Sequence, residues 1–462
     1  MFRKLIGTKE FYKRVLALTI PIMVQNGITN LVNMLDNIMV GRVGTAEMTG
    51  VAIGNQLLFV VNLCLFGALA GAGIFGTQFF GNDDHKGVRD TFRFKLVFSL
   101  ILAGVSIAVL FWGGDTLAKF YLQGEGSPEE AAASLGFSRE YLRIMLWGLV
   151  PFALSQCYSG TLREIGKPTP PMLAGIVAVC VNMCFNYLLI FGKCGFPELG
   201  IRGAAIATVI SRFVELGIVA WWTHSHKQEA RFIEGVYRHF RIPFALTKKL
   251  LRKGASLMVN EALWASGTAV INQSYSLLGL NVVAANNICQ TFFNVFSVAF
   301  MAVGVSVGIV LGQMLGAGDT KGAKETCWKL IAFSVFVSAI SSVLFAVMAF
   351  FIPSVYNTAE SVRETATALM LITAIVMPIE AFVHASYFTL RSGGKVLLTF
   401  FFDCAFMWGI HVPVAFILSR FTSLSILPLF TICELLRLLK GALGYVLVKR
   451  GSWIRNLVKE DT

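Results

Sequence analysis

The chain has 462 residues, of which 56% are hydrophobic and 14% charged, and its mean hydropathy is +0.69. A soluble domain carries about a quarter of charged residues, so this composition excludes an ordinary soluble protein and indicates one that crosses the membrane repeatedly. The formal net charge of +13 does not indicate nucleic-acid binding, because the basic residues are spread over alternate loops and no aromatic stacking residues accompany them.

Twelve apolar segments are predicted to cross the membrane as helices. Runs such as LVFSLILAGVSIAVLFW (96–112) approach the roughly 20 apolar residues that a spanning helix needs. Gly, Pro or charged residues separate them, as in loops. The N-terminal stretch has no signal-peptide cleavage pattern, so we expect the first span to stay in place. The predicted spans lie near residues 15–36, 48–79, 93–112, 140–160, 171–192, 203–222, 254–279, 284–315, 327–352, 364–389, 396–418 and 424–447.

The positions of Lys and Arg predict how the chain is oriented. Basic residues gather at the N-terminus, in the second connection (Lys86, Arg89, Arg93 and Lys95), in the middle connection 223–253 and at the C-terminus. The odd-numbered connections are poor in them. By the positive-inside rule, both termini and the middle connection are expected to be cytoplasmic, in a cell (inner or plasma) membrane.

Two stretches of the chain repeat in the same order. GTQFFGNDDHKGVRDT (76–91) matches LGQMLGAGDTKGAKET (311–326), with Gln78 on Gln313 and Gly81 on Gly316. Further along, TLREIGK (161–167) matches TLRSGGK (389–395). We expect an all-α protein of two parallel six-helix repeats, in which residues 1–222 form an N-lobe, 223–253 a basic connection and 254–462 a C-lobe.

An acidic residue interrupts the first span. Asp36 follows Asn26, Asn30 and Asn33 and precedes Asn37, and these steps of three and four place the polar side chains on one helix face. A polar face on a membrane helix must look into a cavity rather than lipid. The alternative is an interfacial aspartate that caps a helix.

Two further acids lie deep in predicted spans of the second half. Glu261 lies in span seven, and Glu380 lies in span ten near Pro378, which we expect to kink that helix. His384 is one turn beyond Glu380 on the same face. Ionisable groups inside the membrane are candidate functional sites by default. The alternatives are a glutamate bonded to a neighbouring helix, and a buried Glu380–His384 pair without a transport role.

Two asparagines one turn apart in span five, Asn182 and Asn186, could complete an oxygen shell around a small cation with Asp36. Hard cations such as Na⁺ favour oxygen donors. The alternative is interhelical hydrogen bonding. We interpret Arg212 with Glu215, and Glu434 with Arg437, as internal ion pairs.

Motifs for other chemistry are missing from the sequence. The nine cysteines form no CxxC and are interpreted as small packing residues. There is no GxSxG, HExxH or P-loop, so we expect neither an enzyme nor a cofactor. An ion-coupled carrier fits these observations, whereas ATP-driven transport by this chain alone does not.

The sequence resembles the multidrug and toxic compound extrusion (MATE) family, in its NorM-like branch. The resemblance rests on LDNIMVGRVG (35–44), the two Gln-x-x-Gly loops with their Lys-Gly pairs, and GTLREIGKP (160–168) with its second-half copy. It implies a twelve-helix, V-shaped carrier, expected to be a monomer, that exchanges Na⁺ or H⁺ for drug-like, often cationic compounds by alternating access. The alternative is a lipid-linked precursor flippase of the same superfamily, for which the acidic deep charges are unfavourable.

The resemblance also implies which residues act. It assigns cation binding or coupling to Asp36, Asn182, Asn186, Thr208, Glu261 and Glu380, with Na⁺ held by the first four. Asn186 stands where related branches carry an aspartate, which removes one titratable group. We expect the substrate cavity to include Asn33, Gln78, Gln290 and His384.

Overall fold

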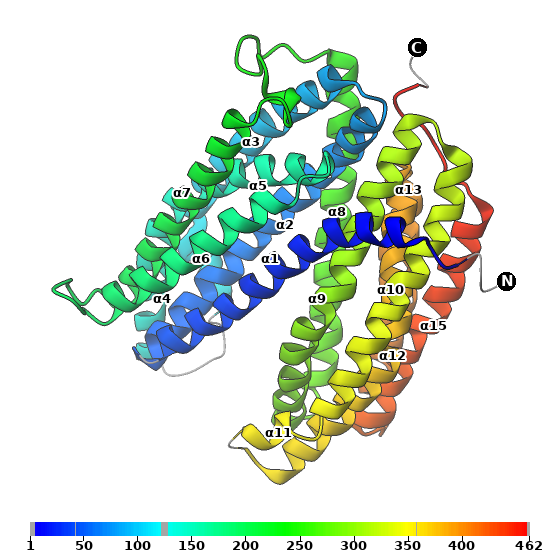
Figure 1. Cartoon of the computed structure of the whole chain (residues 1–462). Coiled ribbons are helices and arrows are strands. Elements are labelled where there is room, and N and C mark those ends of the chain that lie inside the picture. Colours follow the sequence, from blue (N-terminus) through cyan, green and yellow to red (C-terminus); the bar gives the residue numbers. More distant parts are fainter. Residues whose placement is uncertain (1–4, 42, 122–127, 357, 460–462) are drawn as a thin grey trace. The chain divides into compact units, whose positions relative to one another are not determined.

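The computed structural model describes residues 5–41, 43–121, 128–356 and 358–459. Within these ranges the chain is helical and has no β-strand, and twelve long helical segments coincide with the twelve predicted spans, which confirms the prediction (Figure 1). In the first half these are α1 (Lys9–Gly41), α2 (Thr45–Gly81), α3 (His85–Tyr121), α4 with α5 (Pro128–Met145 and Leu149–Glu164), α6 (Thr169–Ile190) and α7 (Ile201–Ser225).

The second half repeats this order. Its six segments are α8 (Phe244–Ser276), α9 (Leu280–Ala317), α10 (Thr320–Met348), α12 (Glu360–Ser392), α13 with α14 (Val396–Phe400 and Val412–Phe421) and α15 (Ile426–Arg450). Two π-helical turns, η4 (Phe401–Ala405) and η5 (Met407–His411), join α13 to α14. Short helices η2 (Leu146–Gly148), η3 (Arg231–Ile233) and α11 (Ile352–Val355) complete the described elements.

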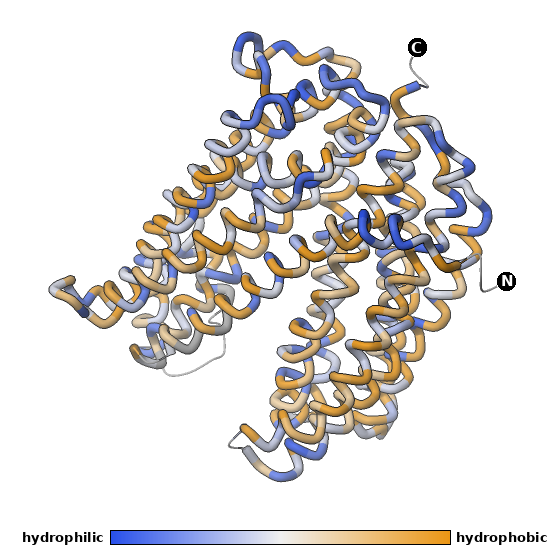
Figure 2. Tube along the Cα trace, in the orientation of Figure 1, coloured by the Kyte–Doolittle hydropathy of each residue, from blue (hydrophilic) through white to orange (hydrophobic). Residues whose placement is uncertain are grey.

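Nine of the described helices are long and apolar enough to cross a membrane. Three long segments fall below this threshold. One is α4 with α5, which is split into two helices. The others are α8 and α15, which carry several polar or charged side chains. Figure 2 shows hydrophobic residues along the helix shafts and hydrophilic residues gathered toward the helix ends and connections. The protein is therefore a multi-pass membrane protein.

The chain divides into two compact units. Unit 1 comprises residues 1–23, 77–84 and 255–462, and unit 2 comprises 24–76 and 85–254. In unit 1, α12 packs against α9, α10 and α15. Residues of α1 enter this core, because Val15, Leu18 and Ile22 are buried among side chains of α9 and α10.

The repeated Gln-x-x-Gly motif marks a close helix crossing in unit 1. A Cβ atom at Gly81 would collide with the backbone carbonyl of Gln313, and one at Gly316 with that of Gln78. The contact is reciprocal, since each glycine meets the glutamine of the other copy. Only glycine lets the two backbones approach this closely.

In unit 2, α6 packs against α7, and α5 lies against α3 and α7. The middle connection is docked on this unit, since Arg93 donates through Nε to the Val236 carbonyl (2.8 Å) and through Nη2 to that of Gly235 (2.8 Å). Phe232, in the same connection, is buried against Phe92. The second connection predicted from its basic residues is shorter than expected, because α3 begins at His85 and places Lys95 inside the helix.

Candidate functional site

Four of the predicted cation-site residues meet in unit 2. Asn186 Nδ2 donates to Asp36 Oδ1 (2.6 Å) and lies 3.1 Å from Asn182 Oδ1. Asn182 Nδ2 in turn donates to Thr208 Oγ1 (3.3 Å), whose hydroxyl donates to the Ala204 carbonyl (3.0 Å). Helices α1, α6 and α7 thus contribute one continuous row of oxygen and amide groups.

The helical spacing explains this row. Asn182 and Asn186 are one turn apart and therefore share a face of α6, which packs along α7. Both are almost fully buried, at 4% and 1% exposure, and Asp36 is half-buried. Asn186 Oδ1 is buried without a hydrogen-bond partner in the described part of the chain. A buried acceptor of this kind costs free energy unless a donor, a water molecule or a cation satisfies it.

The surroundings of the row are polar. Tyr141, which lies near Asp36 and Arg212, donates to Asn55 Oδ1 (3.0 Å). The guanidinium of Arg212 lies 4.8 Å from the centre of the Phe152 ring. The expected ion pair between Arg212 and Glu215 is not among the ion pairs of the described residues. The side chains of Asn33 and Asn37 lie outside the described part of the structure.

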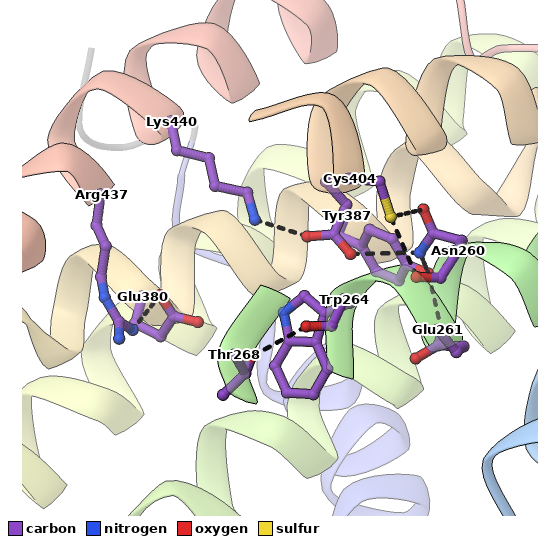
Figure 3. Close-up of polar contacts among 10 residues, drawn as sticks. Asn260, Glu261, Trp264, Thr268, Glu380, Tyr387, Cys404, Arg437 and Lys440 are labelled. Atoms are coloured by element: carbon purple, nitrogen blue, oxygen red, sulfur yellow. Dashed lines mark hydrogen bonds and ion pairs between the residues drawn. The ribbon is translucent and has the colours of Figure 1, made fainter. Parts of the chain in front are cut away.

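A second polar network lies in unit 1 (Figure 3). Lys440 Nζ is 2.6 Å from Asp403 Oδ1, and Asn260 Nδ2 is 3.3 Å from Asp403 Oδ2. The Tyr387 hydroxyl donates to Glu261 Oε1 (3.3 Å). Helices α8, α12 and α15 and the π-helical turn η4 contribute these side chains. Glu261 therefore lies at one end of a hydrogen-bonded network rather than alone in its span.

Glu380 is held by a basic residue. Its Oε2 is 2.6 Å from Arg437 Nη1, and Arg437 also contacts Glu434 at 2.9 Å, which confirms the predicted Glu434–Arg437 ion pair. His384 lies one turn from Glu380 but shows no hydrogen bond to it within the described ranges. Its ring instead meets Phe300 and Phe388 edge-on.

The two glutamines predicted for the substrate cavity differ in environment. Gln78 is fully buried, and its amide donates to the carbonyls of Ser392 (2.9 Å) and Arg455 (3.2 Å) while Oε1 accepts from the Leu457 amide (2.7 Å). These contacts attach the C-terminal segment to unit 1 and leave a ligand little to bind. Gln290 is half-buried on α9.

Asn260, Tyr387, Asp403 and Lys440 were not predicted as site residues. One signal could have found Lys440: the spacing of Glu434, Arg437 and Lys440 by threes places them on one face of α15. From the sequence, Glu261 and Glu380 are the deep charges of the second half, and Glu380 has no assigned cationic partner. The structure gives each of two acids a cationic partner, Arg437 for Glu380 and Lys440 for Asp403.

Polar rows within bundles of membrane-spanning helices are candidate functional sites of a multi-pass membrane protein. The MatE family model matches residues 21–188 and 257–417, more than half of the chain, so the chain belongs to the MATE family and is a transporter rather than an enzyme. This family needs no cofactor.

Relatives resemble the chain over most of its length. It is 27% identical to the probable multidrug resistance protein NorM of Thermotoga maritima, over 90% of this chain and 88% of that one. It is 26% identical to the probable multidrug resistance protein YoeA of Bacillus subtilis, over 88% and 87% of the two chains. A crystal structure of MATE in complex with MaL6 shares the fold, with a TM-score of 0.86, 18% identity and 98% coverage of both chains.

Proposed function

We propose that this chain is a secondary active multidrug efflux antiporter that exchanges Na⁺ or H⁺ for drug-like organic compounds by alternating access. The family and the multidrug resistance proteins that the chain resembles support the exporter assignment and do not favour a lipid-linked precursor flippase. The proposed orientation has both termini on the cytoplasmic side of the cell membrane, and the proposed functional form is a monomer whose halves 1–222 and 254–462 rearrange during transport.

The observation that carries the coupling proposal is the row from Asp36 to Thr208. Within the described residues, Asp36 has an amide partner and no ion-pair partner. Rotation of the Asn186 amide by half a turn would bring its unpartnered Oδ1 beside Asp36, next to Asn182 Oδ1. Carboxylate, amide and hydroxyl oxygens are suitable ligands for Na⁺, and the carboxylate alone can take up a proton.

The acids of unit 1 have a secondary place in this proposal. Glu261 accepts one hydrogen bond from Tyr387 and stays a candidate coupling acid. Glu380 is paired with Arg437, so we propose that it acts on coupling only in a state where that pair opens. His384 and Gln290 remain candidates for the substrate cavity. Cationic cargo is proposed because an organic cation and a coupling ion can favour opposite carrier states through the same acids.

The test is efflux of a fluorescent cationic dye from proteoliposomes, under an imposed Na⁺ gradient and separately under a pH gradient. Asp36→Asn keeps the side-chain shape and removes the charge, so gradient-driven efflux is expected to fall at least tenfold. Asp115→Asn, at an exposed carboxylate paired with Arg139, is the matched control and should behave as the wild type. Gradient-driven efflux that survives in Asp36→Asn would contradict the coupling assignment, and transport driven by neither gradient would contradict the antiporter itself.

A further inference from the structure

The Lys440 ammonium group in unit 1 is held by both charge and aromatic rings. Its Nζ is 2.6 Å from Asp403 Oδ1, 5.4 Å from the centre of the Phe402 ring and 6.0 Å from that of the Phe406 ring. A carboxylate beside aromatic faces is the usual protein environment for an organic ammonium group, because the ring faces carry negative potential. Na⁺ sites, in contrast, are built from oxygen atoms.

The rings and the carboxylate come from one irregular segment. Phe402 and Asp403 belong to the π-helical turn η4, and Phe406 follows it directly. Phe402 and Phe406 are almost fully buried, at 0% and 6% exposure, and are therefore fixed by the surrounding core. π-Helical turns within α-helices occur frequently at functional sites. Here η4 places Asp403 beside the Phe402 and Phe406 rings.

The carboxylate is oriented without help from Lys440. Asn260, 1% exposed, donates to Asp403 Oδ2 (3.3 Å), and the Cys404 thiol donates to Asn260 Oδ1 (3.2 Å). Figure 3 shows Cys404, Asn260 and Tyr387 grouped at the end of the network opposite Arg437. The arrangement of Asp403 and the two rings is thus held by α8 and the core, while the ammonium arrives on the flexible stem of Lys440.

We propose that Asp403, Phe402 and Phe406 form a binding site for an organic ammonium group, which Lys440 occupies as a tethered competitor. The side chains of Lys440 and Asp403 each retain 14% exposure, so the pair is not sealed from its surroundings. A lysine is a point charge on four rotatable methylenes and can leave such a site. Arg437 differs, since two carboxylates hold its planar guanidinium. A cationic cargo would have to displace Lys440 to bind here.

The experiment replaces the tether by a free guest. Lys440→Ala removes three methylenes and the ammonium group, which together correspond to n-propylammonium. In the purified full-length protein, n-propylammonium is expected to raise the unfolding temperature of Lys440→Ala by about 2 °C or more. It should leave the wild type unchanged, because Lys440 fills the site. Purification of the variant is carried out with and without the guest.

Three controls separate the site from a simple cavity. n-Propanol matches the guest in size without its charge and should give no shift. Lys440→Met fills the space with an uncharged side chain and should not respond to n-propylammonium. The double variant Asp403→Asn/Lys440→Ala keeps the cavity and loses the carboxylate, so its response should disappear.

The outcomes decide the proposal independently of transport, because binding is measured on the isolated protein. Recovery of Lys440→Ala only in the presence of n-propylammonium would also support the site. The proposal is overturned if folded Lys440→Ala shows no rise in unfolding temperature with n-propylammonium. It is also overturned if n-propanol gives an equal rise, or if the rise persists in the double variant. Aggregation of Lys440→Ala both with and without n-propylammonium would also overturn the proposal. A site organised by Asn260 and the two rings should bind the free ammonium and restore the fold.

Discussion

An ion pair buried in unit 2 offers a quantitative test of how this unit is held together. Lys95 Nζ of α3 is 2.6 Å and 2.5 Å from the two carboxylate oxygens of Glu164 and 3.1 Å from Thr161 Oγ1, both on α5. The side chains are 1% and 11% exposed. Two glycines of α2 leave room for the Glu164 carboxylate, because a Cβ atom at Gly73 or Gly76 would collide with it.

The expected magnitude follows from burial and distance. Unit charges about 2.6 Å apart attract by about 6 kcal/mol at an effective dielectric constant of about 20. The desolvation of both ions offsets much of this attraction. Lys95→Met removes the ammonium group that the buried Glu164 carboxylate binds at both oxygens, and breaking such a buried pair costs about 3–5 kcal/mol. For a unit of this size, that loss lowers the unfolding temperature by about 10 °C.

Thermal unfolding of the purified protein in detergent measures this loss. Lys86→Met, the same change at an exposed lysine of α3, is the control and should shift the unfolding temperature by about 1 °C or less. The double variant Lys95→Met/Glu164→Gln removes both charges and should recover more than half of the loss. The reasoning is refuted if Lys95→Met behaves like Lys86→Met. It is also refuted if the losses from Lys95→Met and Glu164→Gln simply add in the double variant.

Three further predictions concern segments outside the proposed sites. Trp453→Ala should cost about 3–5 kcal/mol of unfolding free energy, measured by denaturant titration, because this side chain is fully buried. Gly316→Ala should lower the unfolding temperature since its Cβ meets a carbonyl of α2, whereas Gly104→Ala, with open space around it, should not. The hydrogen bond and charge of Lys167 lower the pKa of Glu229, so the contact stabilises the fold above the ordinary value of 4.5. That contribution is lost as the pH falls through the lowered pKa, and Lys167→Met should abolish this pH dependence of the unfolding temperature.

The twelve helices and the row in unit 2 could be predicted because both leave local signals. A long apolar run bounded by Gly, Pro or charge indicates a spanning helix from the local sequence alone. The four-residue step between Asn182 and Asn186 fixes a shared face, and Asp36 is a conspicuous acid in its span. Thr208 came from the family resemblance alone, and it lies beside Asn182.

The network of unit 1 could not be predicted, because it depends on how separate helices are rotated. Asp403 lies in a π-helical turn, where the residues no longer follow the 3.6-residue period. Its partner Lys440 lies 37 residues further along on another helix. The Gln-x-x-Gly motif differs from its prediction for another reason. The sequence indicates a loop there, whereas Gln78 and Gly81 lie at a helix crossing that depends on contact between two backbones.

The two halves place different chemistry on equivalent positions. Helices α7 and α15 each have 25 residues, and Arg212 and Arg437 hold the same position in them. In unit 1 the guanidinium of Arg437 binds Glu380, whereas in unit 2 that of Arg212 lies over Phe152, the residue that the repeat aligns with Glu380.

The acids of the two units therefore differ in what a coupling ion must displace. An ion entering unit 1 at Glu380 or Asp403 has to compete with a tethered cation, while Asp36 offers a carboxylate whose described partner is a neutral amide. Displacing a bound cation offsets part of the free energy that an entering ion gains, so Asp36 is a better place for ion coupling than Glu380 or Asp403. This asymmetry is why the proposed coupling site lies in unit 2 and the proposed ammonium site in unit 1.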